Sequence, residues 1–151
     1  TRDEGDTWTR IKTGLPDRWV SRVVASRHHE ATVYVSLTGY RQDDFSTYLY
    51  KSDDYGATWS SIASNLPAES VNVIHEDPLV EGVLYAGTDL GVYVSTDRGA
   101  GWHSLCNHLP TTPVHDLTVH PRARELIIGT HGRSIYVLDV TKIQDSASPS
   151  P

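Results

Sequence analysis

Short alternating runs of apolar and polar residues, broken by glycine, proline and aspartate, fill most of the chain. The pattern is clearest between residues 71 and 105, where the runs are VNVIHEDP, GVLYAGTD, GVYVSTD and GWHSL. These runs are rich in valine, isoleucine and tyrosine, and no apolar spacing of helical period is long enough to compete with them. The pattern therefore predicts an all-β protein made of short antiparallel strands.

Several landmarks repeat along the chain at the same two intervals. Trp8, Trp59 and Trp102 are 51 and 43 residues apart, and three aspartates and three Leu-Pro pairs repeat these steps. Three tyrosines follow at 43 and 43, so the base period is 43 residues. Such a period is typical of propeller blades or solenoid repeats. The first interval is eight residues longer, and we expect the excess in one loop around GYRQDDFS, residues 39–46.

Four strands fit into each period, as in one blade of a β-propeller. If the strands are named A to D from the centre outward, the chain begins with strand D at about Thr7–Lys12 and then runs A-B-C-D twice. It ends with strands A, B and C at about Val114–His120, Glu125–Thr130 and Ser134–Val140. The predicted fold is thus all-β, a partial β-propeller with blades of four antiparallel strands and three blade equivalents per chain. Residues 1–141 form the blades, and residues 142–151 are predicted to be a Ser/Pro-rich tail or linker.

An eight-residue segment that ends in each repeated tryptophan falls between predicted strands C and D. We call the three copies the box segments: Thr1–Trp8 (TRDEGDTW), Ser52–Trp59 (SDDYGATW) and Ser95–Trp102 (STDRGAGW). In a hairpin turn the aspartate can accept backbone hydrogen bonds, the glycine can take a positive φ, and the tryptophan can begin strand D as an apolar plug between blades. These structural roles are expected for Asp3, Gly5, Trp8, Asp54, Gly56, Trp59, Asp97, Gly99 and Trp102. Trp59 is expected to be largely buried.

The second box segment matches Ser-x-Asp-x-Gly-x-Thr-Trp and so resembles the Asp-box, or BNR repeat, of sialidases, sortilin-type receptor domains and xyloglucan-active glycoside hydrolases. The first has threonine in place of the serine, and the third has Gly101 where threonine is expected, so Trp102 is expected to be held less tightly. The stretch GTHGRSIYVLD, Gly129–Asp139, resembles the closing blade of large bacterial sortilin-like propeller proteins. The resemblance implies an extracellular, periplasmic or cell-surface protein whose box segments lie on the face away from the ligand site.

The opposite face carries the B–C loops and the D-to-A links, where ligand sites of this superfamily usually lie. Aromatic, basic and acidic side chains gather there on a loop that is longer than its equivalents, which suits a polar ligand or a protein surface. The candidate ligand-binding residues are Tyr40, Arg41, Asp43, Asp44, Phe45, Asp89, His131 and Arg133, with Thr88 beside them. An ordinary solvated loop is the alternative for each of them.

Two classes of function remain open. The first is a non-catalytic propeller module that binds a protein or a glycan. The second is a fragment of a glycoside hydrolase, which needs two carboxylates flanking the sugar bond. The string YAGTDLGVY resembles the segment that carries a catalytic aspartate in xyloglucan-active propellers, which makes Asp89 a candidate, but no second carboxylate has a matching context. The arginine triad, tyrosine and glutamate of a sialidase cannot be assembled from three blades.

The composition of the chain argues against several classes of binding partner. A formal net charge of −6 argues against a phosphate-binding surface, so no nucleic acid is expected. No apolar run approaches the roughly 20 residues of a membrane span, so no membrane partner is expected. No cofactor and no metal are expected, since His115 and His120 are predicted on opposite faces of one strand, and His28 and His29 in a turn.

Three blades are too few to close a ring, because propellers typically have about 4 to 8. An open arc exposes apolar blade faces and unpaired strand edges, which favours association. Two copies paired head to tail, each N-terminal strand D completing the other's last blade, would form a six-bladed ring. We therefore expect a homodimer or, since the chain has no methionine and is expected to be a piece of a longer product, neighbouring blades of one parent chain.

Overall fold

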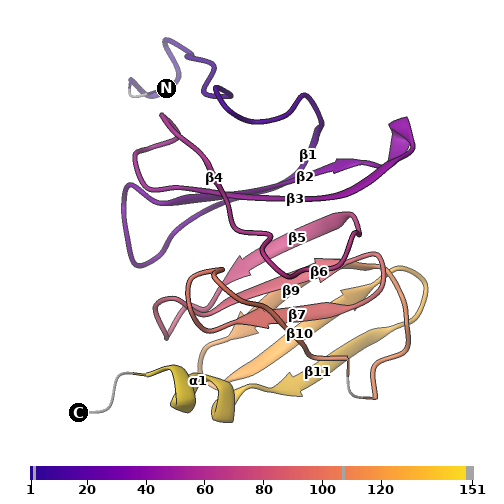
Figure 1. Cartoon of the computed structure of the whole chain (residues 1–151). Coiled ribbons are helices and arrows are strands. Elements are labelled where there is room, and N and C mark those ends of the chain that lie inside the picture. Colours follow the sequence, from indigo (N-terminus) through magenta and orange to yellow (C-terminus); the bar gives the residue numbers. More distant parts are fainter. Residues whose placement is uncertain (2, 107, 149–151) are drawn as a thin grey trace.

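Three antiparallel sheets stand side by side in the computed structural model, which describes residues 1, 3–106 and 108–148 (Figure 1). The strands are β1 (Trp19–Ala25), β2 (Val33–Gly39), β3 (Asp44–Ser52) and β4 (Ser60–Ser61) in the first sheet, β5 (Val71–Glu76), β6 (Leu84–Thr88), β7 (Val92–Ser95) and β8 (His103–Ser104) in the second, and β9 (Val114–His120), β10 (Glu125–Thr130) and β11 (Ile135–Asp139) in the third. Strands that follow one another along the chain are hydrogen-bonded neighbours in every sheet. The predicted all-β fold with blade-like sheets is confirmed.

Apolar side chains between consecutive sheets hold the stack together. Tyr34 and Leu49 of the first sheet belong to one buried cluster with Ile74, Leu84 and Trp102 of the second. A second cluster joins the second and third sheets through the following buried residues: Val73, Val83, Tyr85, Val92, Val94, Val114, Leu117, Val119, Leu126, Ile128 and Val140. Because each sheet contributes to a core on the side of its neighbour, blade packing is the main apolar stabilisation of this fold.

The eight extra residues of the first blade lengthen a hairpin instead of forming only a loop. The strands β2 and β3 have 7 and 9 residues, whereas β6 and β7 have 5 and 4. The short 3₁₀ helix η1 (Tyr40–Gln42) and the left-handed residue Asp43, with φ of 54°, connect β2 to β3. The paired strands carry this connection to the far end of the sheet (Figure 1).

Each innermost strand contains a β-bulge at the same place. The register with the next strand breaks at Ser21 in β1, Asn72 in β5 and His115 in β9, positions 51 and 43 residues apart. A bulge inserts one residue, so it re-aims the side chains that follow. The prediction that His115 and His120 lie on opposite faces of one strand assumed strict alternation, which the bulge at His115 breaks. Both side chains are exposed.

The N-terminal segment does not form the predicted strand D. Residues 7–12 carry no strand and run beside the first blade, at the end of the stack away from β11 (Figure 1). A strand needs a hydrogen-bonding edge, and the edge that lacks a strand D belongs to β11. Ile135 and Val137 of β11 are exposed. The homodimer in which a second copy completes this blade stays a prediction.

The tail or linker predicted for residues 142–151 is wrong in its first part, because α1 (Thr141–Ala147) is a helix that packs against the third and second sheets. Gln144 is fully buried, with its Nε2 donating to Asp77 Oδ2 at 2.8 Å and its Oε1 accepting from Arg124 Nε at 2.6 Å. The polar composition of this segment did not indicate a packed helix, because the side chain that fixes the helix to the sheets is a polar one, the buried Gln144. Residues 149–151 lie outside the described residues.

Candidate functional site

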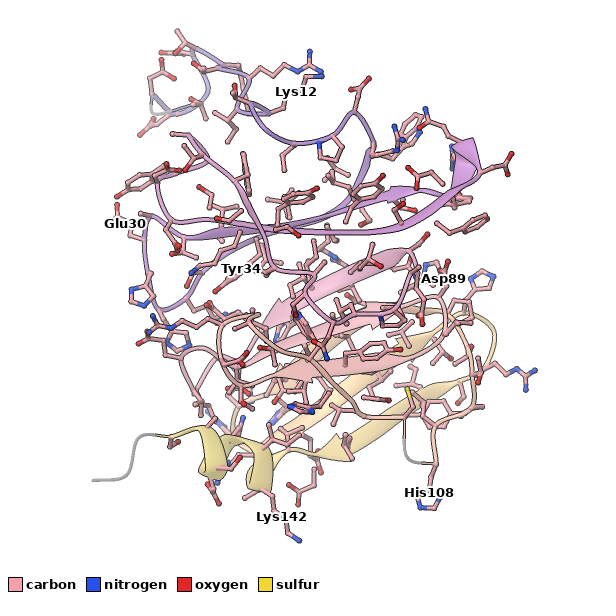
Figure 2. All side chains as sticks on the ribbon, viewed as in Figure 1. Lys12, Glu30, Tyr34, Asp89, His108 and Lys142 are labelled. Atoms are coloured by element: carbon pink, nitrogen blue, oxygen red, sulfur yellow. The ribbon has the colours of Figure 1, made fainter. Side chains whose placement is uncertain are left out.

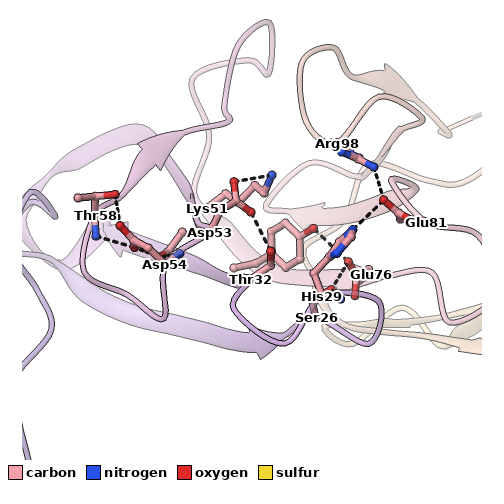
Figure 3. A network of polar contacts seen from close by, with 12 residues as sticks. Ser26, His29, Thr32, Lys51, Asp53, Asp54, Thr58, Glu76, Glu81 and Arg98 are labelled. Carbon is pink, nitrogen blue, oxygen red and sulfur yellow. Dashed lines mark hydrogen bonds and ion pairs between the residues drawn. The ribbon is translucent and has the colours of Figure 1, made fainter.

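The second box segment forms a tight turn closed by its own side chains. Asp54 Oδ1 accepts from the Ser52 hydroxyl and from the Thr58 N–H, both at 2.8 Å, and Asp54 Oδ2 accepts from the Thr58 hydroxyl at 2.6 Å (Figure 3). The Ser52 hydroxyl also accepts from Gly56 N–H at 2.8 Å. Tyr55 and Gly56 have φ of 58° and 86°, so a glycine suits this turn. The aspartate is thus occupied inside its own turn.

The other two box segments repeat these contacts. Asp3 Oδ1 accepts from the Thr7 N–H at 3.0 Å and from the Thr1 hydroxyl at 2.6 Å. Asp97 Oδ1 accepts from the Gly101 N–H at 2.8 Å and from the Ser95 hydroxyl at 2.7 Å. Gly101 has no hydroxyl, so the third turn lacks the bond that Thr58 gives in the second.

The tryptophans that end the box segments differ in burial, in the reverse of the expected order. Trp102 is 3% exposed, Trp59 is only partly buried, and Trp8 is 80% exposed. The indole of Trp102 donates to Ile62 O at 2.7 Å, and that of Trp59 donates to Ile11 O at 3.0 Å. Ile62 follows a strand of the first sheet, whereas Ile11 is part of no strand, so within the described residues Trp102 is covered by a neighbouring sheet and Trp59 by an irregular segment. Burial here depends on the neighbouring blade and not on how closely the box follows its pattern.

Acid is expected to weaken the fold through these turns. The Thr58 side-chain and backbone donors hold the pKa of Asp54 at about 2, below its ordinary value of 3.8. A carboxyl group whose folded-state pKa is lowered contributes stability above its unfolded pKa and loses it as the pH falls toward the folded value. The melting temperature should therefore drop between pH 4 and pH 2, and the drop should be shallower in Asp54→Asn. Asp6→Asn, which removes a carboxylate outside these bonds, should keep the full drop; an equal drop in both variants would contradict the assignment.

An exposed aromatic group lies on the opposite face, around the B–C connection of the first blade. Trp19, Tyr40 and Phe45 are 58%, 49% and 57% exposed. The Arg41 guanidinium lies 5.3 Å from the ring centroid of Trp19 and 5.7 Å from that of Tyr40, and its Nε donates to the Tyr40 hydroxyl at 3.0 Å. We call Trp19, Tyr40, Arg41 and Phe45 the aromatic cluster.

A cavity of about 360 Å³ adjoins this cluster and is lined by Asp17, Arg18, Trp19, Val20 and Gln42. Its polar wall offers hydrogen bonds, and the exposed indole of Trp19 offers a flat apolar surface. Such a combination suits a ligand with both hydroxyl groups and flat apolar faces. The sequence analysis missed Trp19, because this residue begins β1 and lies outside the inserted loop.

Asp44, a candidate ligand residue, is used by the hairpin itself. Its Oδ2 accepts from Arg18 Nε at 2.8 Å and from the Tyr48 hydroxyl at 2.6 Å, and its Oδ1 accepts from Ser46 N–H at 3.0 Å. The Tyr48 hydrogen bond is the largest of the causes that lower the pKa of Asp44. Asp44 thus ties the hairpin to the chain before β1, and the neighbouring Asp43 side chain is exposed.

The bulge residues meet the B–C loops in the second and third blades. Asn72 Nδ2 donates to Asp89 Oδ1 at 2.9 Å, and the rings of His115 and His131 lie 5.2 Å apart. Asp89 and His131 are the first residues after β6 and β10. Figure 2 shows Asp89 at the end of the sheets opposite Glu30. Asn72 and His115 were missed as site residues, although their spacing follows the repeat.

The model of the Sortilin-Vps10 family (sortilin, neurotensin receptor 3) matches residues 47–147, about two thirds of the chain. The chain belongs to the Sortilin-Vps10 family. No curated protein matches it.

Solved structures similar to this Sortilin-Vps10 chain are enzymes of the GH74 class. The xyloglucanase of Xanthomonas campestris has 15% identity and a TM-score of 0.63, with 80% of this chain and 21% of that chain covered. The enzyme of Niastella koreensis has 18% identity, a TM-score of 0.63 and the same coverages, and an ancestral GH74 enzyme has 15%, 0.61, 87% and 19%. These likenesses show the β-propeller fold. The chain spans about a fifth of the length of the enzymes that it matches.

A second carboxylate of this Sortilin-Vps10 chain lies near Asp89. Glu69 is buried, its Oε2 accepts from the Thr88 hydroxyl at 2.5 Å, and its Oε1 accepts from the Tyr93 hydroxyl at 3.2 Å. Burial first, and then the charge of Glu69, raise the pKa of Tyr93 to about 12. Both carboxylate oxygens of Glu69 are therefore hydrogen-bonded, and the candidate residue Thr88 donates to one of them.

The remaining candidates do not join a common cluster. Arg133 is exposed on the B–C loop of the third blade, two residues from His131. Within the described residues, no group of three or more histidine, cysteine, aspartate or glutamate side chains could hold a metal ion. Within the same part of the chain, no helix combines the length and apolar character of a membrane span.

Proposed function

We propose that the chain is a non-catalytic binding module of a β-propeller and that its aromatic cluster binds a polysaccharide. The exposure of Trp19 and Tyr40, whose rings are joined by Arg41, carries this proposal, and Phe45 is a third exposed aromatic side chain at the same hairpin. Large exposed aromatic groups cost solvation free energy, and they are retained where a partner covers them. The flat apolar faces of sugar rings match such side chains.

The geometry of the cluster supports this function because the rings are held before a ligand arrives. Arg41 lies over both Trp19 and Tyr40, and its hydrogen bond to the Tyr40 hydroxyl fixes the pair. Pre-positioned side chains lose less conformational entropy on binding. The cavity beside Trp19 adds the polar groups of Asp17, Arg18 and Gln42, which can bond sugar hydroxyls.

The similar solved structures suggest which polysaccharide to test. All three are described as GH74 enzymes, and the one from Xanthomonas campestris is named a xyloglucanase. We therefore propose a xyloglucan-type β-glucan as the ligand. The location outside the cytoplasm that the resemblance implies would bring the module and such a ligand together, and it stays a prediction.

Trp19→Ala and Tyr40→Ala are each expected to weaken the binding of xyloglucan oligosaccharides at least about tenfold, because each loses a stacking surface. Isothermal titration calorimetry measures this effect. Trp8→Ala is the matched control, since it removes another exposed indole from the segment before the first blade and should leave the affinity unchanged. Equal losses in the Trp8 and Trp19 variants, or no binding by the parent chain, would exclude this site.

A glycoside hydrolase is the second candidate function, favoured by the position of Asp89 on the same face as the aromatic cluster. Hydrolysis needs a pair of free carboxylates. Asp89 accepts a bond from Asn72, and both oxygens of its neighbour Glu69 are engaged. Turnover of xyloglucan oligosaccharides that is lost in Asp89→Asn would favour the enzyme, whereas binding without turnover favours the module.

A further inference from the structure

A second cavity, of about 330 Å³, lies on the face opposite the aromatic cluster, among the turns that join the two innermost strands of each blade. Its polar wall consists of Arg27, His75, Thr118 and His120. Its apolar wall includes Pro121 and Ile127. The three blades each contribute to it, so its shape depends on the stacked sheets and not on one loop.

The lining of this cavity holds one formally charged side chain, the cation Arg27, while the carboxylates of Asp77, Asp116 and Glu76 act on His75 from beyond the lining. No carboxylate lines it, although the chain has a formal net charge of −6. Among the described residues, no ion pair or side-chain hydrogen bond occupies the guanidinium of Arg27. The backbone of Arg27 is fixed, because its N–H donates to Glu76 Oε2 at 2.6 Å. The backbone of Arg27 is therefore held beside the cavity, and the donors of its guanidinium group are available to a ligand.

The half-buried ring of His75 offers one donor in a defined place. Its Nε2 accepts from Val119 N–H at 3.2 Å. Burial, and then the charge of Arg27, lower the pKa of His75, so the ring is neutral near pH 7. In a neutral imidazole whose Nε2 is an acceptor, the proton is on Nδ1. His75 thus has an Nδ1–H for which no acceptor exists among the described residues.

In His120 the roles of the two ring nitrogens are the reverse of those in His75. Its Nδ1 accepts from Ala123 N–H at 3.1 Å, so its Nε2 carries the proton and is a donor. In each histidine a backbone N–H group thus occupies one ring nitrogen as an acceptor, and the other ring nitrogen carries the proton and is a donor. The hydroxyl of Thr118, two residues before His120 on β9, adds a third neutral donor to the same wall.

We propose that this cavity binds an oxyanion group, a carboxylate, phosphate or sulfate, of a small ligand. Arg27 supplies the charge, and His75, His120 and Thr118 supply neutral hydrogen bonds, a combination that suits an oxyanion. The apolar wall of Pro121 and Ile127 gives a place for the hydrocarbon or ring portion of that ligand. This site is independent of the proposed polysaccharide site, because it lies on the other face and uses none of the same residues.

The test uses benzoate, inorganic phosphate and inorganic sulfate as probes, titrated into the ¹⁵N-labelled chain and followed by NMR. Saturable shifts of the Arg27 Nε–H signal and of the ring signals of His75 and His120 are expected with at least one probe. Tighter binding of benzoate than of phosphate and sulfate would identify an organic carboxylate as the ligand class, and the opposite order a tetrahedral oxyanion. Shifts that do not saturate with any probe would overturn the proposal.

Two variants and one control separate this site from general attraction of anions. Arg27→Gln and His120→Asn should each weaken the best probe at least about tenfold, because the first removes the positive charge and the second removes the Nε2–H donor. The Oδ1 of the asparagine can replace the Nδ1 acceptor of His120, so the turn to Ala123 is kept. Arg133→Gln changes the net charge as Arg27→Gln does but lies on the opposite face, and it should bind like the parent. Unchanged binding in Arg27→Gln or in His120→Asn, or an equal loss in Arg133→Gln, would overturn the proposal.

Discussion

Replacing Trp102 with alanine is expected to lower the free energy of unfolding by about 3–5 kcal/mol, the range found when a large buried aromatic side chain is removed. Its side chain packs in the cluster between the first and second sheets and donates to Ile62 O. Its backbone N–H donates to Asn65 Oδ1 at 2.8 Å, and its carbonyl accepts from Asn65 Nδ2 at 2.9 Å. The alanine variant would leave a cavity and an unpaired carbonyl at Ile62.

Trp59→Ala is the matched control for this variant, since the two tryptophans occupy equivalent positions. The free energy of unfolding is expected to fall by only about 1–2 kcal/mol in Trp59→Ala. The Trp59 indole is partly exposed, and it makes one hydrogen bond to Ile11, which is part of no strand. Urea unfolding followed by circular dichroism at one protein concentration gives both values. Equal losses for the two variants would mean that the first and second sheets do not pack around Trp102.

Replacing Asp77 with alanine is expected to cost about 3–5 kcal/mol of unfolding free energy. Asp77 is fully buried, and its Oδ2 accepts from the Tyr85 hydroxyl at 3.1 Å and from Gln144 Nε2 at 2.8 Å. Its Oδ1 accepts from the N–H groups of Leu79 and Val80 at 2.8 and 3.0 Å. The alanine variant leaves two buried side-chain donors without an acceptor, and each costs about 1–3 kcal/mol.

A double-mutant cycle with Gln144→Ala checks the partner assignment. If Asp77 holds α1 through Gln144, the two losses should not add, because the bond between them is removed by either change. Asp116→Ala, which removes an exposed carboxylate paired with Arg22 at the surface, should cost no more than about 1 kcal/mol. Fully additive losses for Asp77 and Gln144 would show that the helix is held by other contacts.

The sequence predicted the blades because their turns carry the signal. Glycine, aspartate and proline mark the hairpins, and the repeated tryptophans set the period, so the strands Val114–His120 and Glu125–Thr130 have the bounds expected. These features are local, and short turns depend on the residues within them. The longer loop also drew attention to Tyr40, Arg41 and Phe45, which the structure leaves exposed, and their role in ligand binding stays a prediction.

The errors have one physical origin, which is dependence on distant neighbours. Thr7–Lys12 has the composition of a strand, but the edge that lacks a strand D belongs to β11 at the other end of the stack. Trp59 has the stronger box, but within the described residues no sheet precedes the first blade to cover it. The bulges that present Asn72 and His115 arise from register between strands, which alternation along one strand does not reveal. Backbone N–H groups of other residues determine which ring nitrogen of His75 and of His120 is a donor, so no sequence motif indicates these donors.

The box turns also bear on the order in which the chain folds. The segment Thr1–Trp8 keeps the bonds from Thr1, Gly5 and Thr7 although it is part of no sheet. Each turn therefore closes over a separation of four residues or fewer, which has a low entropic cost and is fast on the timescale of a whole domain. Docking one sheet on the next joins residues some 40 to 50 positions apart, as Trp102 meets Ile62, and such long-range contacts are slow to form. We therefore expect the turns to form before the blades come together, and the docking of completed hairpins to set the rate of folding.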